Sequence, residues 1–219
     1  MTTPKSLQVT SELYQYILDH SAPADPVLDD LATDTLSVVP DTAHMMVPRD
    51  EAAFLTFLVR LTGARTVVEV GTFTGSSTIA LARGLPEQGR LITCDISTEC
   101  VDLARQYFRR AGLSERIEAR VGPALETLRT LPTEPHIDLV FIDADKPSYI
   151  DYWNELVPRV RPGGLLIVDN TLFSGAVIEP TSGTKAHAID AFNRYAAADS
   201  RVEIVMLHLA DGISLARRL

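Results

Sequence analysis

The stretch EVGTFTGSSTIAL, residues 69–81, constrains the fold of this chain more than any other feature. An apolar run ends at Gly71, and a second glycine, Gly75, precedes a new apolar run over 79–81. This order predicts a strand, a tight turn and a helix. Glycine has no Cβ and tolerates positive φ, so such a turn lets a ligand approach the backbone closely. The side chains available to cap the helix are Ser76, Ser77 and Thr78.

A carboxylate on the following strand indicates a nucleoside cofactor. The apolar run 90–95 ends in Asp95, about 24 residues after Gly71, and in α/β folds an acid at this place binds the ribose hydroxyls. A dinucleotide site would show G-x-G-x-x-G, whereas this turn reads Gly-Thr-Phe-Thr-Gly and has no basic residue close by to meet a phosphate. The pattern favours S-adenosylmethionine, which has a ribose and no phosphate, over an NAD-type cofactor or a turn that binds nothing.

Length and charge exclude several classes of protein. The 219 residues fit one domain over 1–219, with a helical N-terminal segment (1–64) that covers the site and an α/β core (65–219). A net charge of −9 argues against nucleic acid as partner, and no apolar run reaches the roughly 18 residues that span a bilayer. Residues 1–14 lack the apolar core of a secretory signal, and two cysteines make no disulfide framework. We expect a reduced, cytoplasmic protein with no membrane partner.

Apolar strands and amphipathic helices alternate after residue 65, which predicts a mostly parallel sheet with helices on both faces. The last two strands are joined by the short turn 210–212, and a short turn joins only antiparallel neighbours. We therefore expect a Rossmann-like α/β fold with a seven-stranded sheet, one strand of it antiparallel. The expected strands are 66–70, 90–95, 117–121, 137–143, 165–169, 202–207 and 213–217, and the expected helices are 11–20, 25–38, 50–61, 77–83, 99–111, 124–129, 149–159 and 186–198.

Acidic and amide side chains follow two later strands. Asp143 ends the run 137–143, and Asp169 and Asn170 end the run that starts at 165. If the two strands are neighbours, these side chains meet at the carboxyl edge of the sheet. Two carboxylates and an amide supply hard oxygens, which suit Mg²⁺, Mn²⁺ or Ca²⁺. A set of only three protein ligands fits Mg²⁺ best, because this ion usually keeps several water ligands. An acid after a strand is also an ordinary helix cap or turn residue, but the pair on two strands favours a metal site.

Lys146 lies three residues after Asp143. A lysine among carboxylates ordinarily forms a salt bridge. It could also accept a proton from a hydroxyl beside the cation, provided that burial or the cation depresses its pKa. Asp143 and Asp145 would raise that pKa, so both roles stay open. The histidines show no ligand spacing; they include His44, His136, His187 and His208.

Several segments resemble the cation-dependent O-methyltransferases of the catechol and caffeoyl-CoA type. The similar segments are MMVPRDEAAFLTFLVRLTGA, VVEVGTFTGSSTIALA, GRLITCDIS, VGPALETL, FIDADKPSYIDYWNELVPRVRPGGLLIVDN and ADGISLARR. Together they cover nearly the whole chain. Among methyltransferases, DADK (143–146) together with VDN (168–170) is specific to this family.

The resemblance implies roles for individual residues. Asp143, Asp169 and Asn170 correspond to the metal ligands, and Lys146, with Asp143 beside it, to the catalytic general base. Val47 stands where relatives often have Thr; with valine, a contact through the hydroxyl would be lost and a backbone contact kept. Ala52-Ala53 stands where many relatives have Gly-Gln. The residues that correspond to cofactor contacts are Met45, Val47, Glu69, Gly71, Thr72, Ser77, Asp95, Ala124, Asp143, Asp145 and Tyr152.

The resemblance also implies the reaction. We expect methyl transfer from S-adenosylmethionine, with Mg²⁺ or another divalent cation, to one hydroxyl of an acceptor with two adjacent oxygens. A catechol, a caffeoyl-type ester, or a hydroxy-acyl or polyketide intermediate would fit, free or bound to CoA or a carrier. The loop 171–184, with Phe173, Val177 and Ile178, would shape the acceptor pocket, and a homodimer is expected. Two alternatives stay open: a metal-independent methyltransferase on the same fold, and a nucleoside-binding module without catalysis.

Overall fold

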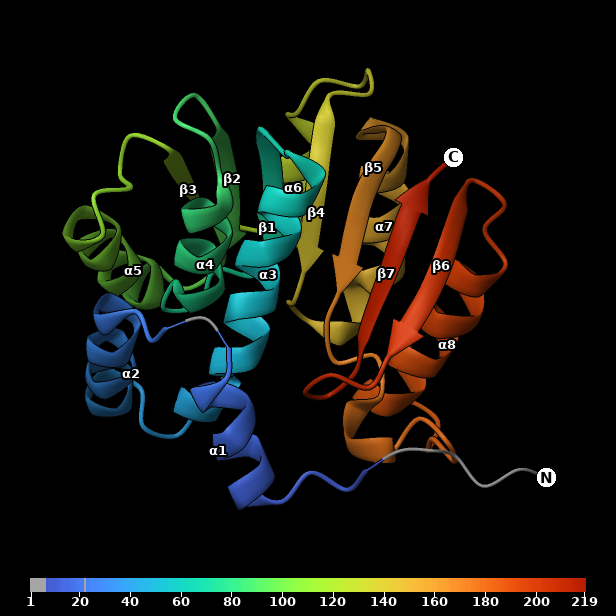
Figure 1. The fold of residues 1–219 in the computed structure, drawn as a ribbon. Coiled ribbons are helices and arrows are strands. Elements are labelled where there is room, and N and C mark those ends of the chain that lie inside the picture. The colour runs from blue at the N-terminus through green and yellow to red at the C-terminus, as the bar shows by residue number, and fades with distance from the viewer. Residues whose placement is uncertain (1–6, 22) are drawn as a thin grey trace.

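A seven-stranded sheet forms the centre of the molecule, with strand order β3-β2-β1-β4-β5-β7-β6 (Figure 1). The computed structural model describes residues 7–21 and 23–219, so the first six residues of the segment used to argue against a secretory signal lie outside it. β7 pairs antiparallel with β5 and with β6, and the other pairs are parallel, which confirms the predicted sheet. The strands are β1 (Thr66–Val70), β2 (Arg90–Asp95), β3 (Ile117–Val121), β4 (Ile137–Ile142), β5 (Val160–Val168), β6 (Val202–Leu207) and β7 (Ile213–Arg218).

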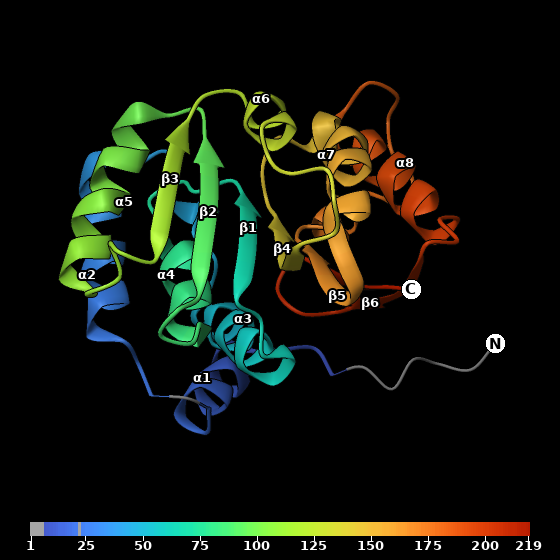
Figure 2. The same cartoon turned by 90° about the horizontal axis from the view of Figure 1, so that it is seen from above.

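Helices cover both faces of the sheet. The view from above in Figure 2 shows α3, α4 and α5 on one face and α6, α7 and α8 on the other. The α-helices are α1 (Ser11–Asp19), α2 (Pro26–Val38), α3 (Arg49–Thr62), α4 (Ser76–Gly84), α5 (Thr98–Arg110), α6 (Ala124–Arg129), α7 (Tyr149–Leu156) and α8 (Lys185–Ala197). Short 3₁₀ turns lie at η1 (Ala43–Met45), η2 (Lys146–Ser148), η3 (Val157–Arg159) and η4 (Phe173–Gly175).

Each central strand contributes to two hydrophobic cores. On β4, Leu139 and Phe141 pack into the core under α3, α4 and α5, whereas Val140 and Ile142 pack into the core under α6, α7 and α8. All four side chains are fully buried. Because successive strand residues point to opposite faces, a strand covered on both sides reads as a continuous apolar run. This is why the core strands were readable from the sequence.

Element boundaries account for most differences from the sequence prediction. β5 begins at Val160, not at residue 165, and its pairing with β4 shifts register between Ile137 and Leu139. Gly163, at φ +79°, lies in this irregular stretch, so its glycine signal marks a bulge in the strand. Pro158 falls in the 3₁₀ turn that ends α7 at Leu156. The expected helix over 149–159 was therefore too long, and the expected strand too short.

Two local expectations about helices were wrong. α4 begins at Ser76 with Gly75 as its N-cap, and no side chain caps it. On α3, Phe57 and Leu61 are more than half exposed, although their helical spacing with Phe54, Leu55 and Leu58 in the expected helix 50–61 predicts that they lie on its apolar face. Within residues 7–21 and 23–219, no helix has the length and apolar character needed to cross a bilayer. Both cysteines are buried free thiols.

Candidate active site at the carboxyl edge of the sheet

A cavity of about 1160 Å³ opens at the carboxyl ends of β1, β2, β4 and β5. Its wall includes residues from the N-terminal segment as well as the strand ends; those of the N-terminal segment are Thr42, 44–48 and Glu51. Every predicted site residue except Glu69 lines it. These residues are Met45, Val47, Gly71, Thr72, Ser77, Asp95, Ala124, Asp143, Asp145, Lys146, Tyr152, Asp169 and Asn170.

Packing alone accounts for both glycines of the β1–α4 turn. A Cβ on Gly71, which has φ +103°, would lie 1.9 Å from the Asp143 carbonyl oxygen. A Cβ on Gly75, at φ +96°, would lie 2.8 Å from the Phe108 ring and 2.9 Å from Ala104. Positive φ and these clashes both require glycine. The turn therefore does not by itself indicate a ligand.

Asp95 lies at the end of β2 and holds the same turn. Its Oδ2 accepts the Phe73 N–H at 2.7 Å, and its Oδ1 accepts the Ser97 N–H at 2.9 Å. Phe73 has φ +46°, a conformation uncommon for non-glycine residues. Each carboxylate oxygen can accept more than one hydrogen bond, and Asp95 also lines the cavity. It can thus position the turn and still meet a ligand hydroxyl.

Glu69 is fully buried behind this turn and does not line the cavity. Its Oε2 accepts hydrogen bonds from the hydroxyls of Thr78 and Thr93, the latter at 2.6 Å, while its Oε1 has no partner. Burial raises the pKa of Glu69 to about 7, although the nearby hydroxyls, Ser77's among them, lower it. The Thr72 hydroxyl also turns inward, 2.6 Å from that of Thr93. In this structure, Glu69 is a buried support of the turn.

Asp145 lies beside the cavity and is held by two hydroxyls. Tyr152 donates to its Oδ1 and Ser148 donates to its Oδ2 at 2.5 Å. Burial, followed by the hydrogen bond to Asp145, raises the pKa of the Tyr152 phenol well above its ordinary value. This arrangement fixes a carboxylate on the cavity wall, where the sequence placed a cofactor contact.

Lys146 forms hydrogen bonds with two of the predicted metal ligands, Asp143 and Asn170. Its Nζ donates to Asp143 Oδ1 at 2.9 Å, to Asn170 Oδ1 at 2.6 Å and to the Tyr149 hydroxyl at 2.6 Å. β4 and β5 are hydrogen-bonded neighbours, so the strand ends that precede Asp143 and Asp169 meet as predicted. Asn170 has φ +56°, a conformation uncommon for non-glycine residues. The structure thus gathers two oxygen donors around one positive charge.

Asp169 is nearly buried on the same edge, 3% exposed. Its Oδ1 accepts the N–H of Asn170 at 2.6 Å. Burial, and next the negative charge of Asp143, raise the pKa of Asp169 to about 7, against the lowering effects of that hydrogen bond and of Lys146. Two carboxylates share this place with one ammonium, which leaves an unbalanced negative charge at low solvent exposure.

Glu51, in the first turn of α3, is a third carboxylate of the cavity that the sequence reading missed. It is 1% exposed, and neither Oε1 nor Oε2 has a hydrogen-bond partner. Burial, and next the charges of Asp169 and Asp143, raise its pKa to about 9. Helical spacing was the available signal, since Glu51 lies one turn before the buried Leu55. In the part of the chain that the structure describes, no three His, Cys, Asp or Glu side chains converge closely enough to hold a metal ion.

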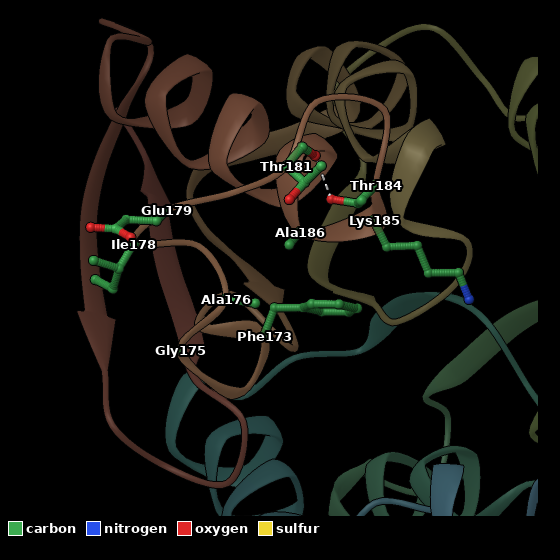
Figure 3. A pocket seen from close by; sticks show the side chains of 9 residues that line it. All are labelled: Phe173, Gly175, Ala176, Ile178, Glu179, Thr181, Thr184, Lys185 and Ala186. Atoms are coloured by element: carbon green, nitrogen blue, oxygen red, sulfur yellow. Dashed lines mark hydrogen bonds between the residues drawn. The ribbon is translucent and has the colours of Figure 1, made fainter.

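The loop after β5 forms a second, smaller cavity of about 470 Å³. Figure 3 shows Ile178 and Glu179 on one side of it and Lys185 extending to the other. Phe173 and Lys185 line both this cavity and the larger one. Phe173 therefore reaches the larger cavity, whereas Ile178 lines only the smaller one and Val177 lines neither. Lys185, at the start of α8, was not predicted.

Comparison with known proteins identifies the class. The sequence profile of the O-methyltransferase family matches residues 18–219. Caffeoyl-CoA O-methyltransferase 2 of Zea mays is 39% identical over 98% of this chain and 86% of its own length. The Arabidopsis thaliana caffeoyl-CoA O-methyltransferase 1 is 34% identical over 98% of this chain and 87% of its own. The chain belongs to the O-methyltransferase family and is an S-adenosylmethionine-dependent O-methyltransferase.

Solved structures agree with this assignment. The O-methyltransferase from Bacillus cereus in complex with SAH superposes with a TM-score of 0.85, at 34% identity, over 93% of this chain and 96% of that one. TomG from Streptomyces achromogenes, an O-methyltransferase involved in tomaymycin synthesis and solved in complex with SAM, gives 0.87 at 30% identity over 94% and 96%. The Rossmann-like fold expected from the sequence is thereby confirmed.

Proposed function

We propose that this enzyme uses a divalent cation to methylate one hydroxyl of an acceptor with two adjacent oxygens. The observation that carries the proposal is the Lys146 ammonium held between Asp143 and Asn170. These oxygens already bind a cation, and the neighbouring Asp169 carboxylate is not balanced by a second one. Mg²⁺ suits so small a set of oxygen donors because it keeps several water ligands.

The side chains fit such a cation in chemistry and in charge. Two carboxylates and an amide are hard oxygen donors, and Asp143, Asp169 and Asn170 all border the cavity. Without a cation, the carboxylates of Asp143 and Asp169 repel one another, which adds to burial in raising the pKa of Asp169. Lys146 would share Asp143 and Asn170 with the cation, so cation binding and the position of its Nζ are coupled.

The same cavity fits the methyl donor. Asp95 would accept from the ribose hydroxyls, and Ala124 would lie against the base. Met45 and Val47 would cover the cofactor from the N-terminal side, with Gly71, Thr72 and Ser77 along the turn and Asp145 and Tyr152 near the methionine moiety. Glu69 would act from behind the turn, because it does not line the cavity. The N-terminal segment would thus cover the site, as part of a single domain.

The chain's own groups account for the proton and the geometry. S-adenosylmethionine supplies an electrophilic methyl group on a sulfonium, and the cation supplies positive charge that favours an ionised acceptor hydroxyl. Lys146 Nζ would receive the proton of that hydroxyl, provided that it is neutral when the acceptor binds. Tyr149 holds Nζ in place at 2.6 Å. Reactants fixed at near-attack distance supply much of the acceleration.

The acceptor class rests on the relatives and on the cavity. The plant relatives are named caffeoyl-CoA O-methyltransferases, and a catechol-like ring would fit the larger cavity beside Phe173. We therefore propose a catechol, a caffeoyl-type ester or a hydroxy-acyl intermediate, free or bound to CoA or a carrier. Incubation with labelled S-adenosylmethionine, Mg²⁺ and a panel of catechols and acyl thioesters, read by mass spectrometry, tests this. The proposal fails if no diol or thioester of the panel is methylated.

A metal-independent methyltransferase is the second candidate. The observation in its favour is that Lys146 already satisfies Asp143 and Asn170. Dialysis against EDTA separates the two: turnover should fall to the background rate and return with Mg²⁺ or Mn²⁺. Full turnover after cation removal would support the second candidate.

The homodimer stays a prediction, to be tested by light scattering.

A further inference from the structure

Glu51 has no structural role that the fold itself explains. It lies in the first turn of α3, where an acidic side chain ordinarily caps backbone N–H groups or complements the helix dipole from solvent. Yet neither of its oxygens accepts a hydrogen bond, and the residue is 1% exposed. The preceding Asp50 shows the contrast, because its Oδ1 accepts from the Tyr14 hydroxyl at 3.1 Å and ties α3 to α1. A buried carboxylate without partners costs free energy.

The Glu51 side chain borders the same cavity as the proposed metal ligands. Asp169 and Asp143 lie close enough for their charges to act on it. With Glu51, three carboxylates border this part of the cavity, and Lys146 is their ammonium neighbour. A single ammonium cannot neutralise three carboxylates, and a divalent cation would supply the missing positive charge. Among the described residues, however, three carboxylates do not converge within direct ligand distance. A role for Glu51 thus requires a bridging molecule.

We propose that Glu51 accepts hydrogen bonds from water bound to the divalent cation at Asp143, Asp169 and Asn170. This inference rests on the proposed cation dependence. Mg²⁺ and Mn²⁺ keep water ligands where protein donors are few, and a carboxylate is the strong acceptor that such polarised water needs. Because Glu51 comes from α3, it would link the N-terminal segment to the cation, whereas the direct ligands come from β4 and β5.

The test measures Mn²⁺ affinity in the presence of SAH, by electron paramagnetic resonance of the free ion. The variants are Glu51→Gln, which keeps the shape and removes the charge, and Glu51→Asp, which withdraws the carboxylate by one methylene. Loss of a partner that orients metal ligands costs about 10–100-fold in metal affinity, so we expect that loss for Glu51→Gln and an intermediate loss for Glu51→Asp. Asp50→Asn is the matched control, and we expect less than a threefold change.

The outcomes separate this inference from the proposed function. If the wild-type protein binds no Mn²⁺, cation dependence fails and the inference fails with it. If the wild-type protein binds Mn²⁺ and Glu51→Gln binds it equally well, only the inference is overturned. In that case a changed acceptor KM would assign Glu51 to the acceptor. SAH affinity within twofold of wild type shows that each variant is folded. Should Glu51→Gln not fold, Glu51→Asp decides by the same measurement.

Discussion

The two halves of the cavity differ in how their polar groups are satisfied. On the β1–β2 side, the protein itself explains nearly every residue: Gly71 and Gly75 avoid backbone and side-chain clashes, and Asp95 accepts two backbone N–H groups. On the β4–β5 side, Asp169 and Glu51 are buried carboxylates whose pKa is raised first by burial and then by neighbouring carboxylates, Asp143 in both cases. The fold alone gives no reason to keep them there.

This difference shows where the information about function lies. The fold needs these residues whether or not a ligand binds. A glycine turn and an acid on β2 are therefore weak evidence for a ligand-binding site by themselves. Crowded, poorly paired charges cost stability, and perturbed pKa values gather at functional sites for that reason. The acidic side therefore carries the proposed chemistry, and changes there should affect turnover more than folding.

The largest effect is expected for Asp169→Ala. Removing a proposed cation ligand should reduce turnover by about 10³-fold or more, because the cation's charge, worth several kcal/mol, and its orienting role are both lost. SAH affinity should change less than threefold, since Asp169 belongs to the acidic side. Calorimetry with SAH and initial rates at increasing Mg²⁺ measure both. Asp102→Ala, an exposed acid on α5, is the control. Wild-type stimulation by Mg²⁺ in Asp169→Ala would remove that residue from the cation site.

Lys146→Ala comes next. General base catalysis is typically worth about 10²–10⁴-fold, and kcat should fall by that amount while SAH affinity stays near the wild-type value. Cation affinity should not fall, because Nζ occupies oxygens of Asp143 and Asn170. Raising the pH should partly rescue the variant, and Lys146→Arg should not, since guanidinium stays protonated. A loss of kcat below threefold at neutral pH would reduce Lys146 to a salt-bridge residue.

The apolar runs and local motifs of the sequence were sufficient to predict the strands and the acidic edge of the sheet. Contacts between residues far apart in the sequence could not be predicted in this way. All seven strands followed from apolar runs, and 143–146 with 168–170 located the acidic edge. Glu51 was missed because an acid in a helix's first turn is ordinary, and only the packing of α3 reveals its burial. The start of β5 was missed because Gly163 resembles a loop signal. The contacts of Glu69 with Thr78 and Thr93 depend on the tertiary fold.

The buried Glu69 allows a test of the β1–β2 side through stability. Its folded-state pKa is raised from 4.5 to about 7, so the folded protein binds this proton more tightly than the unfolded chain does. Its stabilising contribution is full below pH 4.5 and is lost as the pH rises through about 7. The shift corresponds to about 3 kcal/mol. Glu69→Gln should lose less stability than wild type between pH 5 and pH 8, by roughly that amount.

Denaturant unfolding at the two pH values measures this difference. The pKa values of Glu51 and Asp169 are also raised in the folded protein. Both residues are present in the wild-type protein and in Glu69→Gln, so the comparison of the two isolates Glu69. Equal pH dependence of the free energy of unfolding in the two proteins would mean that Glu69 is ionised when folded. The raised pKa of Glu69 would then be wrong, and the hydroxyls of Thr78 and Thr93 would hold a carboxylate ion.

The smallest effect is expected for Asp95→Ala. A hydrogen bond to a charged group contributes about 1.5–3 kcal/mol, and S-adenosylmethionine affinity by calorimetry should fall by that amount if Asp95 holds the ribose. Part of the loss could come through the turn, since Asp95 also accepts the Phe73 N–H. Asp138→Ala is the matched control: Asp138 accepts the N–H groups of Arg65 and Thr66 at 2.8 Å, at the opposite edge of the sheet. Asp138→Ala should cost stability and leave the affinity unchanged. Unchanged affinity in Asp95→Ala as well would leave Asp95 with a structural role only.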